Sequence, residues 1–326
     1  MVLRILIVTA VAAEADSVAA GLTFGGPGSG EHPLPGGFVL RRHARTAPET
    51  APPPPSGPHP GARPGTPAGS DAMPARGTDT GPADGAAPGS GSRSPSRTAS
   101  GSQEPGHVLV DVLVGGVGPA SVAVATATAL AWASREHASP SAAGDPGPPT
   151  PPPATALPYD LVVSAGIGGG FQPGAPIGSV VVSDAIVAAD LGAETPDGYL
   201  AVDALGFGRS VHRVPEQVTG RISAALAGGG QRHTVGPVLT VSTVTGSAER
   251  AAELARRHPG AVAEAMEGFG VAEAAAAYGV PVVEIRAVSN AVGPRDRGAW
   301  RIGRALDALR VAFQLLSHSV LVEPAP

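Results

Sequence analysis

The stretch from Glu264 to Asn290 constrains the fold more than any other part of the chain. It reads EAMEGFGVAEAAAAYGVPVVEIRAVSN, an Ala-rich run followed, after Pro281, by the β-branched run VVEIRAV. This order predicts a helix, a tight turn and a buried strand. Glu267 lies near the start of the helix, and Arg286 and Asn290 lie near the end of the strand. Because ligands of open α/β sheets bind at such strand ends, we expect a site here.

Apolar runs alternate with helix-favouring segments along the rest of the chain. The runs LRILIVTAV, HVLVDVLVGGVG and YDLVVSAGIGGGF are typical of strands buried on both faces. The first run is followed by a predicted helix that ends at Gly21, and RIGRALDALRVAFQLLSHSV has apolar residues at helical spacing. The GGVG turn favours a tight strand-to-helix connection over a nucleotide loop. The alternation predicts an α/β fold with helices flanking a mostly parallel or mixed central sheet.

Two segments depart from this pattern. The chain of 326 residues contains 46 glycines and 36 prolines, which concentrate from about 44 to 105 and from about 139 to 157. These segments have almost no large apolar residues and cannot bury enough surface to offset the entropy of ordering. We therefore expect disordered inserts in one domain that otherwise spans 1–326. A solvated loop without function and a Pro-rich ligand for a partner both remain open for the first insert.

The composition excludes several classes of function. A net charge of -5 and a charged fraction of 15% leave no basic patch for nucleic acid. The chain has no cysteine, which excludes a disulfide framework, a thiolate metal site and a cysteine nucleophile. No apolar run approaches the ~18 to 20 residues of a membrane span, and Glu14 and Asp16 follow the N-terminal run at once. We expect a cytoplasmic protein that binds neither nucleic acid nor membrane.

The central stretch carries a family motif. It consists of a Met-Glu-Gly step, a helix, Val-Pro and a strand ending R-x-x-S-N, here Met266, Glu267, Gly268, Val280, Pro281, Arg286, Ser289 and Asn290. This pattern resembles the nucleoside phosphorylase and nucleosidase superfamily. Within it, VTAVAAEAD, SAGIGGGF, VVVSDAIVAADLGAE and SNAVGPRDRGAW are most similar to the branch that hydrolyses futalosine in menaquinone biosynthesis. The resemblance covers nearly all of the chain outside the inserts and implies one nucleoside-phosphorylase-like domain without cofactor or metal.

The resemblance implies residues that hold the sugar and the nucleophile. Glu267 would accept hydrogen bonds from the ribose hydroxyls, with Met266 as an apolar surface beneath the ring. Glu14 would orient or deprotonate the attacking water, and its alternative is a first-turn acid favoured by the helix dipole. Arg286 would hold that water, or pair with Glu267 or Glu14. The turn that faces the ribose and the nucleophile would consist of Ile167, Gly168 and Gly169.

Asn290 would select the base. An amide can donate to N7 or O6 and accept from N1–H, which suits a 6-oxopurine such as hypoxanthine, whereas the family members that cleave 6-aminopurines typically have aspartate here. The alternative is an asparagine that only forms a turn. Ser289 precedes it in the motif, and Val244 lies in the turn where many nucleosidases place an aromatic residue. Phe207 is then a substitute for stacking on the base.

Futalosine also has a carboxyphenyl ketone on the 5′ side of its ribose, and that carboxylate needs a cationic partner. Arg295 and Arg297 are candidates, with Trp300 as an aromatic wall. A surface salt bridge to Asp296 or to a neighbouring helix explains the two arginines about equally well. Asp184, near the end of its strand, fits either a catalytic role or the capping of a turn.

These features predict hydrolysis of futalosine to hypoxanthine and dehypoxanthine futalosine. The nearest rival is a nucleosidase for methylthioadenosine, S-adenosylhomocysteine or aminodeoxyfutalosine, followed by a purine nucleoside phosphorylase. A binding module without catalysis is a rival of a different class. The family resemblance implies a small-molecule purine nucleoside as the substrate and a homo-oligomer whose neighbouring subunits complete the pocket.

Overall fold

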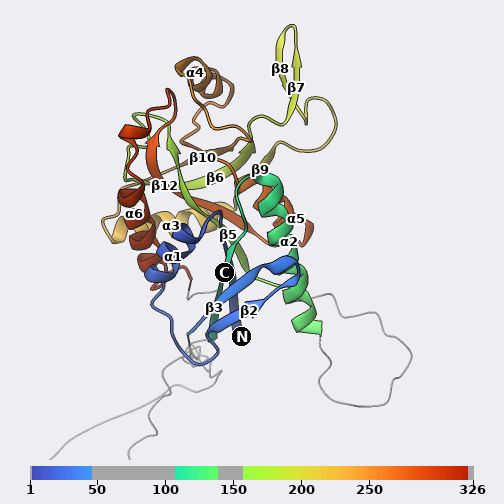
Figure 1. The fold of residues 1–326 in the computed structure, drawn as a ribbon, viewed down its shortest axis with the longest axis vertical. Helices are drawn as coiled ribbons and strands as arrows, with labels where there is room; N and C mark the ends of the chain where they lie inside the picture. Colours follow the sequence, from blue (N-terminus) through green and yellow to red (C-terminus); the bar gives the residue numbers. More distant parts are fainter. Residues whose placement is uncertain (1, 46–106, 139–156, 322–326) are drawn as a thin grey trace, which may run out of the picture. The chain divides into compact units, whose positions relative to one another are not determined.

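The chain folds around a mixed sheet of ten strands in a computed structural model that describes residues 2–45, 107–138 and 157–321 (Figure 1). The strands of this sheet are β1 (Val2–Thr9), β2 (Gly30–Pro33), β3 (Val39–Arg45), β4 (His107–Val114), β5 (Leu161–Gly170), β6 (Val180–Ala188), β9 (Val211–Arg213), β10 (His233–Thr240), β11 (Ala263–Ala265) and β12 (Val282–Ala291). Two further strands, β7 (Gly192–Thr195) and β8 (Gly198–Ala201), form a separate hairpin.

The strand order explains where a site can form. The sheet runs β11-β10-β6-β12-β5-β1-β4-β3-β2, and β11 also pairs with β5. This extra pairing joins β5, β12, β6, β10 and β11 into a closed ring of strands, whereas β1 to β4 extend it as an open sheet. The strand ends of β5, β11 and β12 therefore meet, although they lie far apart in the sequence.

Helices cover both sides of the sheet. The helices are α1 (Ala12–Gly21), α2 (Pro119–Ala138), α3 (Glu216–Gly228), α4 (Ala248–Arg257), α5 (Gly268–Ala277) and α6 (Ile302–Leu316), with 3₁₀ turns η1 (Pro35–Gly37) and η2 (Arg297–Ala299). Helices α1, α3 and α6 pack together on one side, and α2 packs against α5 on the other (Figure 1). Because both faces are covered, the central strands are almost entirely apolar and buried.

The predicted fold class is confirmed, and so is the helix that ends at Gly21. The expected helix and strand of the central stretch are α5 and β12, but Glu264 belongs to β11 and the helix begins only after Glu267. No helix in the described ranges is long and apolar enough to cross a membrane.

The boundary of the first predicted insert needs a correction. Strand β3 continues through Arg45, and its buried Ala44 pairs with Leu109, so these two residues belong to the sheet. Leu157 is described and is exposed. The remaining predicted insert residues, 46–105 and 139–156, lie outside the described residues.

Two helical glycines give a matched test of this packing. A Cβ at Gly21 would lie 2.4 Å from the Arg310 carbonyl oxygen on α6, whereas a Cβ at Gly220 on α3 meets nothing within 4 Å. We expect Gly21→Ala to lower the free energy of unfolding by about 1 to 3 kcal/mol through overpacking. Gly220→Ala should raise it by about 0.4 to 1 kcal/mol, because alanine restricts the unfolded chain. Urea denaturation measures both, and a stabilised Gly21→Ala would contradict the tight α1–α6 contact.

Candidate active site

A cavity of about 350 Å³ opens where β5, β11 and β12 meet the first turns of α1 and α5. Its lining residues are Ala10, Val11, Glu14, Val117, Ile167, Gly168, Gly169, Val244, Thr245, Glu264, Ala265, Met266, Glu267, Ser289, Asn290, Val292 and Trp300. The cavity therefore collects most of the residues predicted for substrate and nucleophile. Among the described residues that line it, three are glutamates and none is basic.

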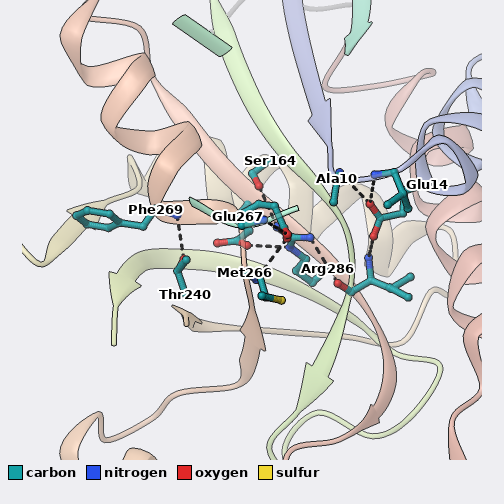
Figure 2. Close-up of polar contacts among 12 residues, drawn as sticks. Ala10, Glu14, Ser164, Thr240, Met266, Glu267, Phe269 and Arg286 are labelled. Atoms are coloured by element: carbon teal, nitrogen blue, oxygen red, sulfur yellow. Dashed lines mark hydrogen bonds and ion pairs between the residues drawn. The ribbon is translucent and has the colours of Figure 1, made fainter. Parts of the chain in front are cut away.

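Glu14 lies at one end of this cavity. It is in the first turn of α1 rather than at the end of β1, which stops at Thr9, and its side chain is buried. One carboxylate oxygen accepts the N–H groups of Ala10 at 2.9 Å and Val11 at 3.3 Å, and the other accepts that of Ile167 at 2.8 Å (Figure 2). Glu14 is thus both an acid in the first turn of a helix and a residue that lines the cavity. Three backbone donors fix the carboxylate and leave about one of its four acceptor sites for a ligand.

Glu267 lies across the cavity at the N-terminus of α5. One oxygen accepts from the Gly118 N–H at 3.1 Å, and the other accepts from the Met266 N–H at 3.3 Å and pairs with Arg286 Nη2 at 3.2 Å. Met266 is half-buried beside it and lines the cavity. The weakest of these bonds, from Met266, is the one that an incoming hydroxyl can replace most easily.

Arg286 lies beneath the cavity and connects its parts. Its guanidinium bonds Glu284 at 2.8 Å, the Ser164 hydroxyl at 3.2 Å and the Ile167 carbonyl at 3.4 Å, in addition to Glu267 (Figure 2). Burial opposes the charge, but Glu284, Glu267 and Glu14 outweigh it and raise the pKa of Arg286. Only 1% of the side chain is exposed, and the ion pair with Glu267 considered from the sequence is present.

This arrangement requires a glycine at position 166. A Cβ on Gly166 would lie 2.5 Å from both Arg286 Nη1 and Glu14 Oε1. Any side chain at this position would keep the guanidinium and the carboxylate from approaching each other over β5. Gly166 pairs with Arg286 in the β5–β12 ladder, so the glycine-rich end of β5 is a packing requirement of the site.

Asn290 lies at the other end of the cavity because β12 contains a bulge. Ser289 is the extra residue, so Val288 pairs with Gly168 and Asn290 pairs with Gly169. The Asn290 Nδ2 group donates to the Ala291 carbonyl at 2.9 Å, and the Ser289 hydroxyl lies 2.8 Å from Oδ1 and 3.2 Å from the Gly168 carbonyl. The carbonyl of Ala291 can only accept, which fixes the amide orientation and leaves one N–H of Nδ2 for a ligand.

The predicted residues for the 5′ side lie at the rim. Trp300 lines the cavity, and the guanidinium groups of Arg295 and Arg297 lie 5.4 and 5.9 Å from its ring centroid. Neither arginine lines the cavity itself. Asp296 accepts from the Gly298 N–H and caps η2 instead of forming the salt bridge considered above.

Two further residues considered from the sequence do not line this cavity. Phe207 is 79% exposed and is not among the described residues that line it. Asp184 is exposed in the middle of β6 and also does not line it. Val244 does line it, from the turn between β10 and α4.

Other residues at the site were not predicted. Gly118, with φ +90, donates its N–H to Glu267, so the glycine turn before α2 supports the site. Glu284 and Glu264 are buried carboxyls beside the predicted groups. Each is a single acid in an apolar run, and that was the only signal the sequence offered. In the described part of the chain, no cluster of His, Cys, Asp or Glu could hold a metal ion.

Residues 96–318 match the phosphorylase superfamily, and the chain belongs to this superfamily. The futalosine hydrolase of Streptomyces coelicolor is 67% identical over 160 residues, which are 49% of this chain and 66% of that protein. The futalosine hydrolase of Thermus thermophilus is 38% identical over 164 residues, 49% of this chain and 70% of that protein. A methylthioadenosine/S-adenosylhomocysteine nucleosidase of Mycobacterium tuberculosis is 29% identical over 153 residues, 40% of this chain and 59% of that protein.

The matches therefore span about two thirds of the length of these futalosine hydrolases. Solved structures agree on the fold. The futalosine hydrolase of Helicobacter pylori superposes with a TM-score of 0.60 at 13% identity, covering 97% of this chain and 98% of that one. A Neisseria meningitidis nucleosidase in complex with methylthio-immucillin-A gives 0.59 at 15% identity, covering 97% and 99%. The resemblance drawn from the motifs is confirmed.

The buried pair of Glu284 and Arg286 predicts how stability depends on pH. Burial raises the pKa of Glu284 above its ordinary value of 4.5, although Arg286 opposes the shift. The folded protein then binds this proton more tightly than the unfolded chain does, so its stability falls as pH rises from about 4.5 through the raised pKa. Glu284→Gln cannot ionise but still offers an oxygen to Arg286. In urea titrations, the free energy of unfolding of the parent should fall relative to that of the variant as the pH rises above 4.5. A difference that rises with pH would contradict the shift.

Proposed function

We propose that this protein hydrolyses the N-glycosidic bond of futalosine, giving hypoxanthine and dehypoxanthine futalosine. The observation that carries the proposal is the composition of the cavity: Glu14, Glu267 and Asn290 all line it, so it offers two carboxylates and an amide, and no described lining residue is basic. Phosphorolysis needs a site for a phosphate anion, and three glutamates would repel that anion. Water is neutral and needs only an acceptor, so the lining favours hydrolysis.

The nucleophile would be a water held by Glu14. The Glu14 carboxylate has about one acceptor site that is not used by backbone donors, and a water proton can occupy it. As the water oxygen bonds to the anomeric carbon, Glu14 takes its proton. The bond from that carbon to the purine nitrogen breaks, and the electron pair leaves with the base.

The sugar becomes positively charged in this step. The Glu267 carboxylate would accept from the ribose hydroxyls and stabilise the cation, while the Met266 side chain lies along the ring. Arg286 and Gly118 hold Glu267 in place, so it is oriented before the substrate binds. The free Nδ2 hydrogen of Asn290 would donate to N7 or O6 and stabilise the negative charge that develops on the leaving base.

The substrate is supported by two independent arguments. The relatives named futalosine hydrolase share up to 67% identity with this chain, against 29% for the methylthioadenosine/S-adenosylhomocysteine nucleosidases. Asn290, rather than aspartate, favours a 6-oxopurine. We also propose a homo-oligomer, because the family resemblance implies one. A monomer mass in sedimentation would count against it.

Free-base release tests the reaction class. We expect the protein to release hypoxanthine from futalosine equally well with and without phosphate. Glu14→Gln should lower kcat by about 100- to 10,000-fold, because the general base is lost. Asp16→Asn is a matched control on the same helix, since Asp16 is exposed and pairs with Arg41, and it should keep full activity. Chromatography of the products measures both. A strict phosphate requirement would make the protein a phosphorylase, and no release from any nucleoside would leave a binding module.

Base choice tests Asn290. Asn290→Asp places a carboxylate against the acceptors N7 and O6. The resulting repulsion can be relieved only by protonation of the acid. We expect kcat/KM for futalosine to fall by about thirty- to a thousand-fold, equivalent to the ~2 to 4 kcal/mol of a lost charge-stabilising hydrogen bond. Aminodeoxyfutalosine should be affected much less, because its exocyclic amine can donate to the new carboxylate. If the ratio of the two kcat/KM values does not move toward the aminopurine, Asn290 does not recognise the base.

A further inference from the structure

Glu264 is a buried carboxyl that lines the same cavity and has no part in the steps above. Its side chain is 5% exposed, and both of its oxygens face Thr245. One oxygen accepts the Thr245 N–H at 2.9 Å, and the other accepts the Thr245 hydroxyl. Burial raises the pKa of Glu264 while the bonds from Thr245 lower it, so a further donor would stabilise the charged form.

The sheet register places Glu264 and Asn290 in one row. Glu264 of β11 pairs with Gly169 of β5, and Gly169 pairs on its other side with Asn290 of β12. Directly paired residues point to the same face of a sheet, so both side chains lie on the face of Gly169. A Cβ on Gly169 would be 3.3 Å from Asn290 Nδ2, which confirms this direction for the amide.

Glu264 and Asn290 line the same cavity, and two strand spacings, about 9.6 Å, separate their backbones. Gly169 has no side chain, and the Val292 side chain packs over it, since a Cβ on Gly169 would lie 2.9 Å from Val292 Cγ2. A planar bicyclic base in the cavity can lie against Val292 with a hydrogen bond at each edge. The two edges meet groups of opposite polarity, an N–H donor on Asn290 and acceptor oxygens on Glu264.

We propose that Glu264 determines specificity for 6-oxopurines by accepting the N1–H of the base. The inference rests on the proposed function and names a second residue that recognises its base. A 6-oxopurine offers N7 and O6 as acceptors on one edge and N1–H as a donor, which matches Asn290 and Glu264 together. A 6-aminopurine has an unprotonated N1 with a lone pair, which a carboxylate repels. The bonds from Thr245 use about two of the four acceptor sites of the carboxylate and leave room for N1–H.

A structural role for Glu264 predicts different behaviour. If the carboxyl only holds the turn that contains Thr245, its replacement should weaken every purine equally. If it accepts N1–H, its replacement should change the preference between purines. Glu264→Gln keeps the shape and can still bond Thr245, and its amide can donate to the N1 of adenine.

Calorimetry with free hypoxanthine and free adenine measures this preference without depending on catalysis. We expect the parent to bind hypoxanthine more tightly, and Glu264→Gln to reduce the ratio of the two affinities by about 10- to 100-fold, as for a lost hydrogen bond to a charged group. Glu216→Gln, on the exposed first turn of α3, is the matched control.

The outcomes separate this inference from the proposed function. Equal weakening of both bases in Glu264→Gln, or a parent that binds neither base, overturns the role of Glu264. Futalosine turnover is measured in parallel with the same proteins. If the base preference moves as expected while the parent releases no base from futalosine, the recognition by Glu264 stands and the proposed hydrolysis fails.

Discussion

The site depends on one buried guanidinium. Arg286 is almost fully enclosed, and a charge in that position is tolerated only if it is paired and hydrogen-bonded. Its partners come from β12 itself, from β5 and from the residue that begins α5. Removing one partner of such a pair typically costs about 3 to 5 kcal/mol, so the three elements are held in one arrangement. The orientation of Glu267 follows from this arrangement.

Close packing around Arg286 also explains why two positions near it are glycine. Gly166 allows Arg286 and Glu14 to approach each other, and Gly268 does the same for Glu284, since a Cβ there would lie 1.9 Å from Glu284 Oε2. That oxygen has no hydrogen-bond partner among the described residues and lies at the N-terminal end of α5, where the helix dipole favours negative charge. The glycine of the Met-Glu-Gly step thus makes room for a carboxylate beneath the one that faces the cavity.

Patterns within single segments of the sequence predicted part of the fold and part of the candidate site. Periodicity predicted the α/β sheet and the helices, and the motif predicted Glu267 and Asn290, which line one cavity, and Arg286, which pairs with Glu267 beneath it. The roles of Glu264 and Glu284 depend on pairing between distant strands and on the bulge at Ser289, which no local pattern shows. A lone acid in an apolar strand does not reveal whether it faces solvent, a turn or a buried arginine. Phe207 was considered only because the turn at Val244 lacks an aromatic residue, and no local pattern shows that its side chain is exposed.

The charge distribution also explains where the anionic end of the proposed substrate must lie. Three glutamates line the cavity, a lining that suits a sugar cation and a neutral water but repels a carboxylate. Apart from the buried Arg286, Arg295 and Arg297 are described cations close to Trp300, which lines the cavity. In the proposed function, a substrate with its purine at Asn290 and its ribose at Glu267 would direct its 5′ carboxyphenyl group along Trp300, where it would contact the aromatic ring and two guanidinium groups. The same separation would keep phosphate away from the sugar in the proposed reaction, because an anion attracted to these two arginines would meet glutamates at the carbon that reacts.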